Sequence, residues 1–149
     1  MNSDLSKYFN EDLENPNYLY LGSAKEINFV ELERENAENN TFEMFLTSHY
    51  YTAGAIAFAE KLARKNKDQN YYIKIDSKKI PIMEANNVEN LDEKDTAYIY
   101  VFEYNDDYVT TDNDFQFKTN TVQMPVDKLE ITYKDFNTYY KVYDNSKKR

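Results

Sequence analysis

The chain has 149 residues, with 18 basic and 27 acidic side chains, a formal net charge of −9 and no cysteine. This length suits one domain with a real core, and the absence of cysteine excludes a disulfide framework and thiol chemistry. Because a strongly acidic chain repels phosphates, we expect no direct contact with nucleic acid or membrane. No stretch is apolar enough for a signal sequence or a membrane span, which predicts a cytoplasmic protein.

The first third of the chain predicts one short helix and three strands. Apolar residues recur at helical spacing over 3–13, and Pro16 ends that pattern, so residues 1–16 are expected to form a helix and a connector. The polar segment 33–41 reads as a loop. The apolar, β-prone runs that predict strands are 18–21, 27–32 and 42–46.

The main helix is expected over residues 48–64. Ser48 is a good N-cap, and basic residues occupy the last turns, where they suit the helix dipole. One face of the helix carries Tyr51, Ala55, Phe58, Ala59 and Leu62.

The C-terminal half predicts strands almost throughout. In 97–104 both alternating sets of side chains are apolar or aromatic, which indicates a central strand covered on both faces. The basic tail 145–149 is expected to fray. The other expected strands are 71–76, 80–83, 115–119, 129–133 and 139–143. The sequence therefore predicts a single α+β domain over 1–149, with a mostly antiparallel twisted sheet.

A candidate ligand site lies where two strands end. The strand 18–21 runs into Gly-Ser, and the strand 42–46 runs through small polar residues into the main helix. Free N–H groups at a helix start bind anions, so this arrangement favours a nucleotide pocket. The candidate ligand-binding residues are Tyr20, Gly22, Ser23, Thr47, Ser48, Tyr50 and Tyr51.

Four short motifs carry a resemblance to a known family. They are Tyr-Leu-Tyr-Leu-Gly-Ser at 18–23, Met-Phe-Leu-Thr-Ser at 44–48, Ala-Tyr-Ile-Tyr-Val-Phe at 97–102 and Val-Gln-Met-Pro at 122–125. Their order resembles small bacterial and phage proteins of the ADP-ribosyltransferase-like fold. The resemblance implies a pocket for NAD, with NAD as a candidate cofactor.

The catalytic positions depart from that family's pattern. The usual ribose-binding His falls at Leu21, which forms no hydrogen bond, and the late-strand Glu falls near Gln116, which carries no charge. Glu103 is the substitute acid if the alignment shifts. The resemblance therefore implies a weak or inactive member, and leaves enzyme activity open.

The acidic residues support an alternative function. They are solvated surface, or they mimic nucleic acid and occupy the basic site of a protein partner, as an anti-defence inhibitor from a phage or mobile element does. The candidate partner-binding residues are Glu31, Glu33, Glu35, Glu38, Asp106, Asp107, Asp112 and Asp114.

A second alternative centres on His49, the single histidine. The segment Ser-His-x-x-Thr-Ala at 48–53 is similar to viral ring nucleases that cleave cyclic oligoadenylate, which would make His49 a general acid. A lone His at a helix start is equally a capping-turn residue. One His and no Cys predict no metal site. Nothing in the sequence predicts the oligomeric state.

Overall fold

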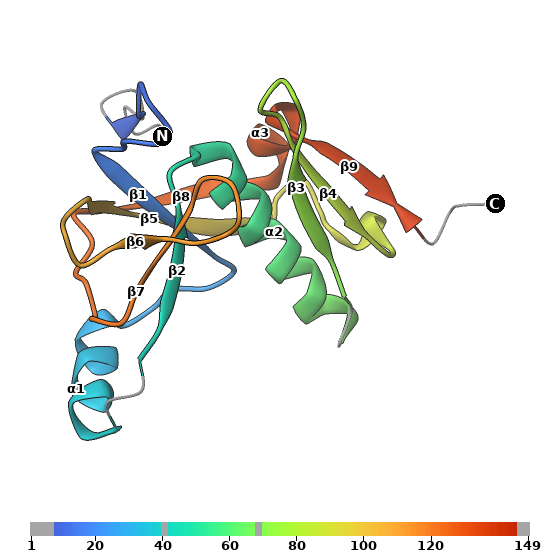
Figure 1. The fold of residues 1–149 in the computed structure, drawn as a ribbon. Coiled ribbons are helices and arrows are strands. Elements are labelled where there is room, and N and C mark those ends of the chain that lie inside the picture. Colours follow the sequence, from blue (N-terminus) through green and yellow to red (C-terminus); the bar gives the residue numbers. More distant parts are fainter. Residues whose placement is uncertain (1–7, 40–41, 68–69, 146–149) are drawn as a thin grey trace. The chain divides into compact units, whose positions relative to one another are not determined.

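The computed structural model describes residues 8–39, 42–67 and 70–145, which divide into two compact units (Figure 1). The first unit takes in Met1–Leu21, Glu26–Tyr50 and Tyr100–Leu129, and the second takes in Gly22–Lys25, Tyr51–Ile99 and Glu130–Arg149. The described residues form three α-helices and nine strands, which confirms the α+β class and the mostly antiparallel sheet. Among them no helix is long and apolar enough to cross a bilayer.

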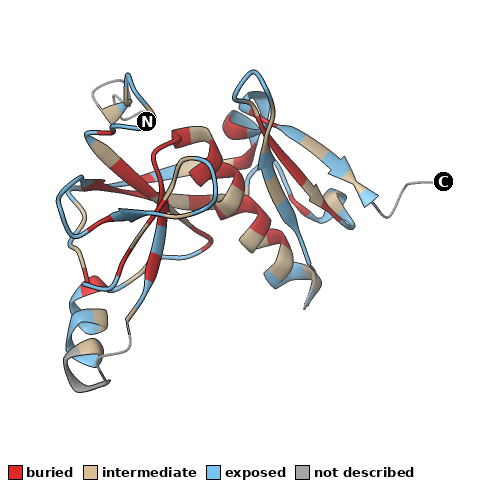
Figure 2. Ribbon diagram, in the orientation of Figure 1, coloured by how far each residue is buried: buried red, intermediate tan, exposed pale blue. Residues whose placement is uncertain are grey.

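Six strands form the larger sheet. Strand β5 lies between two other strands of this sheet. Its consecutive residues Ile99, Tyr100, Val101 and Phe102 are all buried, which confirms the prediction of a strand covered on both faces (Figure 2). In order across the sheet the strands are β6 (Val109–Thr110), β7 (Gln116–Thr119), β2 (Met44–Thr47), β1 (Tyr18–Ser23), β5 (Thr96–Glu103) and β8 (Asp127–Thr132).

The segment predicted as a strand over 27–32 and a loop over 33–41 is instead a helix, α1 (Phe29–Asn39). The Asn28 side chain accepts a hydrogen bond from the N–H of Glu31 at 3.0 Å, which caps the first turn. Phe29 packs against Tyr100 and Phe102, with ring centroids 4.9 and 5.6 Å apart. The cap and this one aromatic anchor outweigh the β-propensity of the segment.

The helix predicted over 3–13 is not found in its described part. Residues 9–13 form no helix, and residues 3–7 lie outside the described residues. Asn10 and Asp12 explain the difference, because both side chains bond to nearby backbone groups and so compete with helical hydrogen bonds. The predicted tail 145–149 lies, apart from Asn145, outside the described residues.

The second unit contains most of the main helix, α2 (Tyr50–Asn66), which begins two residues later than predicted. Its smaller sheet has the order β3 (Tyr72–Ile75), β4 (Pro81–Ala85) and β9 (Lys141–Asp144), with β3 antiparallel and β9 parallel to β4. The remaining helices are η2 (Val88–Asn90), α3 (Tyr133–Phe136) and η3 (Asn137–Tyr139). Eight of the nine predicted strands are present, and β6 is a strand that the sequence does not predict.

Both glycines of the chain allow close packing on α2. A Cβ atom on Gly22 would lie 1.9 Å from the carbonyl oxygen of Ala53, which is backbone and cannot move aside. A Cβ atom on Gly54 would lie 1.9 Å from the Phe136 ring, which is a side chain. Gly22 therefore has a packing role, between the end of β1 and the helix backbone.

This difference predicts unequal effects of two alanine substitutions. Gly22→Ala should lower the free energy of unfolding by about 3 kcal/mol, because the added methyl group displaces backbone. Gly54→Ala should cost less, because the Phe136 ring can turn and alanine favours the helix by about 1 kcal/mol. Urea unfolding measures both. Equal losses, or a larger loss for Gly54→Ala, would contradict this account of Gly22.

Candidate functional site

Three predicted site residues lie in one row across the first unit's part of the sheet. Tyr20 on β1 is the register partner of Thr47 on β2, and Thr47 is the register partner of Gln116 on β7. Antiparallel partners lie about 5 Å apart, so the row brings together residues nearly 100 positions apart in the sequence. The structure therefore places three separately named candidate residues side by side, a pairing that the sequence analysis does not predict.

The polar groups of this row already bond to the protein itself. The Tyr20 hydroxyl donates to the carbonyl of Tyr8, and burial raises the pKa of this phenol. The Thr47 hydroxyl accepts the N–H of His49 at 3.0 Å. The Gln116 side-chain oxygen accepts from the Thr111 hydroxyl at 2.6 Å and from the Asn113 amide at 3.0 Å. Each group holds local backbone or a turn in place.

The three residues after Thr47 are also buried and in contact with other parts of the protein. Ser48 is 1% exposed, its hydroxyl donates to the Leu13 carbonyl at 2.7 Å, and its N–H donates to the Phe115 carbonyl at 3.0 Å. His49 is 9% exposed, with its ring 6.4 Å from that of Phe115. Tyr50 is buried and packs against Phe9 and Tyr20. A general acid must reach its substrate, and the burial of His49 does not favour that role.

Phe115 has an unusual backbone conformation beside these residues. Its φ of 60° lies in the left-handed region, which bulky residues rarely adopt. Two hydrogen bonds hold this conformation. The N–H of Ser48 donates to the Phe115 carbonyl, and the N–H of Gln116 donates to the Asn113 carbonyl at 3.3 Å. The strain therefore belongs to the tight connection between β6 and β7.

The other predicted ligand-binding residues belong to the second unit. Gly22 packs on the α2 backbone, as described above. The Ser23 hydroxyl donates to the Lys25 carbonyl at 2.6 Å, and the Tyr51 ring stacks on Tyr139 with centroids 4.8 Å apart. Glu103, at the end of β5 in the first unit, is exposed and does not belong to the row.

The eight candidate partner-binding acids belong to the first unit, and the seven whose side chains the structure describes are exposed. Glu31, Glu33 and Glu35 are exposed on α1, and the side chain of Glu38, in the last turn, lies outside the described side chains. Asp106, Asp107, Asp112 and Asp114 are exposed on both sides of β6. No ion pair within 8–39, 42–67 and 70–145 involves any of these residues, although Asp107 accepts a hydrogen bond from Gln123 at 3.1 Å.

Counting the charges of each unit reveals a separation that the sequence analysis does not predict. The ranges of the first unit hold 16 acidic and four basic residues, a net charge of −12, whereas those of the second hold 11 acidic and 14 basic residues, a net charge of +3. Two of the first unit's cations are paired, Lys118 with Glu43 at 3.6 Å and Lys128 with Glu26. The whole excess of negative charge therefore belongs to the first unit.

Two apolar side chains are exposed among the acidic residues. Phe45 on β2 and Val109 on β6 are 46% and 52% exposed. Both are register partners of Lys118 on β7, so the three share one face of the sheet. An apolar centre with a charged rim is the usual composition of a protein interface. The alternation of buried Met44 and Leu46 around Phe45 is the signal that could have revealed this residue.

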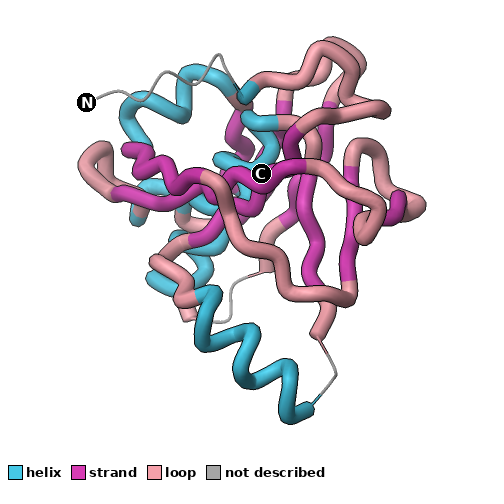
Figure 3. The backbone as a smooth tube through the Cα atoms, turned by 90° about the vertical axis from the view of Figure 1, so that its left-hand side faces the viewer, coloured by secondary structure: helices cyan, strands magenta, loops and turns pink. Residues whose placement is uncertain are grey.

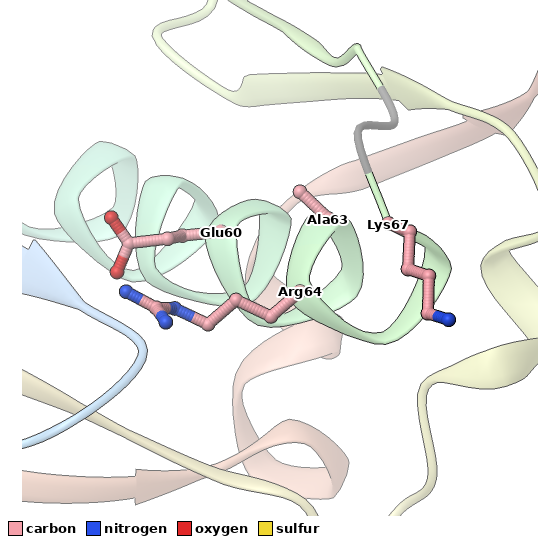
Figure 4. Close-up of a pocket in the computed structure, with 4 residues that line it drawn as sticks. All are labelled: Glu60, Ala63, Arg64 and Lys67. Atoms are coloured by element: carbon pink, nitrogen blue, oxygen red, sulfur yellow. The ribbon is translucent and has the colours of Figure 1, made fainter.

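A hollow lies elsewhere, along α2 in the second unit (Figure 4). It is lined by Glu60, Ala63, Arg64 and Lys67, and the side chains of Glu60 and Arg64 extend along the same side of the helix. The Glu60 carboxylate accepts a hydrogen bond from the N–H of Ala24 at 2.7 Å, so one of its oxygens already has a partner within the protein. None of the predicted site residues lines this hollow.

Comparisons with protein-family models, with curated proteins and with solved structures find no match for this chain. Within the described residues no group of three or more His, Asp or Glu side chains is placed to hold a metal ion.

The roles of two buried tyrosines predict opposite effects of removing their hydroxyl groups. Tyr20 is 1% exposed and donates to a carbonyl, whereas Tyr108 is 3% exposed and its hydroxyl has no hydrogen-bond partner among the described residues. Tyr20→Phe should lower the free energy of unfolding by about 1 kcal/mol, because it leaves the Tyr8 carbonyl without its donor. Tyr108→Phe should leave it unchanged or raise it. Chemical unfolding of both variants tests this, and a stabilised Tyr20→Phe would show that its hydrogen bond does not hold β1 in place.

Proposed function

We propose that this chain is a non-enzymatic binding protein that presents its acidic first unit to the basic, phosphate-binding surface of a partner protein. The separation of charge carries the proposal. A net charge of −12 on one unit creates a field that attracts a cationic surface and raises the rate of association. Carboxylates at the surface would take the places of nucleic-acid phosphates on such a partner.

Helix α1 keeps acidic residues at two places where local preferences oppose them, although Glu31 itself suits the first turn. Glu31 and Glu35 are four residues apart, where like charges destabilise a helix by about 0.2–0.5 kcal/mol. The last turn contains Glu38 and no basic residue, although the helix dipole favours cations there. Residues that oppose the stability of their own element are expected where a surface serves another purpose.

The other candidate residues support a binding role more than a catalytic one. Tyr20, Ser23, Thr47, Ser48 and Gln116 all direct their oxygen atoms to the chain's own backbone or turns. An interface, by contrast, needs exposed charge around an apolar centre, which Phe45 and Val109 provide beside the acidic residues.

The test is displacement of nucleic acid from a basic protein. The probe is labelled duplex DNA held by a purified HU-type nucleoid protein, and the full chain should release the DNA in a salt-dependent way. Replacing Glu31, Glu33, Glu35 and Glu38 by Gln, or Asp106, Asp107, Asp112 and Asp114 by Asn, should weaken this competition about tenfold or more, because long-range attraction is lost.

A charge-matched control separates a specific surface from general acidity. The second unit offers four exposed acids, Glu89, Glu93, Glu130 and Asp135, whose amide variant changes the net charge by the same amount. This control should leave competition within about twofold of the original. An equal loss in control and test variants, or no release of DNA, would refute the acidic unit as a binding surface.

The row of Tyr20, Thr47 and Gln116 favours a second candidate, a nucleotide-binding pocket of the ADP-ribosyltransferase-like kind with weak or no activity. A ligand at about 100 times its dissociation constant stabilises its protein by about 2.7 kcal/mol. Millimolar NAD or ADP-ribose should then raise the melting temperature by several degrees, and Thr47→Val should abolish the rise. An unchanged melting temperature would eliminate this candidate and leave the first untouched.

A further inference from the structure

The smaller sheet of the second unit has one face that nothing so far explains. In its register, Tyr72 on β3 pairs with Glu84 on β4, and Glu84 pairs with Tyr143 on β9. One step along, Lys74 pairs with Ile82, and Ile82 with Lys141. Alternate residues of a strand share a face, so these six side chains lie together on what we call the tyrosine–lysine face.

This face is open to solvent at both sides of its centre. Tyr72 and Tyr143 are 60% and 50% exposed, and the side chains of Lys74 and Lys141 are 50% and 52% exposed. On the central strand, buried Ile82 lies between the two lysines and half-buried Glu84 lies between the two tyrosines, so the floor of the face is apolar at one end and acidic at the other. The opposite face carries Met83 and Ala85, which are fully buried (Figure 2). The sheet therefore packs its core on one side only.

Both lysines form ion pairs, and one of them also lies beside a ring. Lys74 Nζ lies 5.9 Å from the centre of the Tyr72 ring and 3.2 Å from the Glu84 carboxylate. Lys141 Nζ lies 3.3 Å from the Asp76 carboxylate, which also accepts the N–H groups of Lys78 and Ile80. Exposed ion pairs of this kind contribute only about 0–1 kcal/mol, so both ammonium groups can exchange partners.

More positive charge follows the same edge of the sheet. Lys78 and Lys79 lie between β3 and β4, at the end of the small sheet where the parallel strand β9 begins with Lys141. Figure 1 labels the three strands, and Figure 3 shows all strands in magenta from another side. The second unit as a whole carries +3. The expectation of no nucleic-acid partner rests on the net charge of the whole chain, and it does not describe this unit.

We propose that the tyrosine–lysine face binds single-stranded nucleic acid, with bases stacked on Tyr72 and Tyr143 and phosphates bound by Lys74, Lys141 and the adjoining turn. Exposed rings beside lysines are the two elements that bind single strands without reading their sequence. The two tyrosine strands lie about 10 Å apart, twice the spacing of neighbouring strands, and Glu84 of β4 lies between them, so each ring would stack on its own base. A duplex keeps its bases stacked on one another, so the rings favour single strands.

An acidic peptide is the competing occupant, and the rings argue against it. A peptide carboxylate needs only the ammonium groups, whereas exposed aromatic side chains at corresponding positions of both outer strands add a large π surface that a base covers. This site is independent of the acidic surface proposed above, because every residue of it belongs to the second unit.

The experiment measures fluorescence anisotropy of labelled oligouridine and oligothymidine of about 15 nucleotides with the full chain, in about 50 mM salt. The double variant Tyr72→Leu, Tyr143→Leu should weaken binding about tenfold or more, since each stacked base contributes strongly. The double variant Tyr72→Phe, Tyr143→Phe keeps the rings and should bind within about twofold of the original. Far-ultraviolet circular dichroism verifies that both variants fold.

Lysine variants provide the second arm. Lys74→Gln with Lys141→Gln should weaken binding and flatten its salt dependence, whereas Lys94→Gln with Lys134→Gln, two exposed lysines of the same unit outside this face, should change it little. No binding by the original chain, equal binding of a duplex, or no effect of the Tyr→Leu changes would overturn the proposal. Competition by polyglutamate that depends on the lysines but not on the tyrosines would assign the face to an acidic peptide instead.

Discussion

One side-chain amide, that of Asn10, forms four hydrogen bonds that fix the first unit. It donates to the carbonyls of Tyr18 and Ser48 at 2.9 and 2.8 Å, and it accepts the N–H groups of Asn17 and Tyr18 at 2.9 and 3.0 Å. These backbone groups lie where β1 begins and where β2 has just ended, and unpaired buried groups of this kind destabilise a fold. The residues that the sequence marks as a ligand pocket therefore lie where the chain must satisfy its own backbone. That constraint leaves function to the exposed surfaces.

The two surfaces can differ in charge because buried contacts, and not surface charges, stabilise each unit. In the first unit, aromatic contacts and the Asn28 cap keep α1 folded, so its exposed positions are free to be acidic at a cost of a few tenths of a kcal/mol per pair. In the second unit, Phe136 packs against Phe58 and Tyr51, and its ring fills the space that Gly54 leaves. Core packing of this kind places no demand on the sign of the surface charge, so two surfaces of opposite sign exist in one chain.

The sequence predicts an element well where one of its faces must be buried. It predicts an element poorly where a single side chain decides whether the segment forms a helix or a strand. The strands β1, β2, β5 and β7 and the helix α2 follow from hydrophobic patterning alone. Helix α1 does not, because Val30 and Ile27 favour a strand, and the deciding contact is the cap from Asn28. The sequence marks Thr47 and Gln116 separately as candidate site residues, but it predicts neither their pairing nor their hydrogen bonds, and those of Gln116 depend on the tight turn at Phe115. Propensity averages over residue types, whereas these contacts depend on single side chains and on the particular backbone conformation around them.

The tyrosine–lysine face shows that neither short sequence segments nor the net charge of the chain reveal a surface built from distant strands. Tyr72 and Tyr143 lie in short segments that read only as strands, and they become neighbours because β4 pairs in parallel with β9, 59 residues further along the chain. No window of sequence contains both. The net charge of −9 excludes nucleic acid only if the charge is spread evenly over the protein. Screening limits an exposed charge to about 8–10 Å at physiological salt, so a ligand responds mainly to the charges within that distance and not to the total of the chain. A protein of negative net charge can therefore carry a local surface suited to phosphates, and the proposal for the second unit depends on the positions of four exposed side chains, not on the sum of the charges.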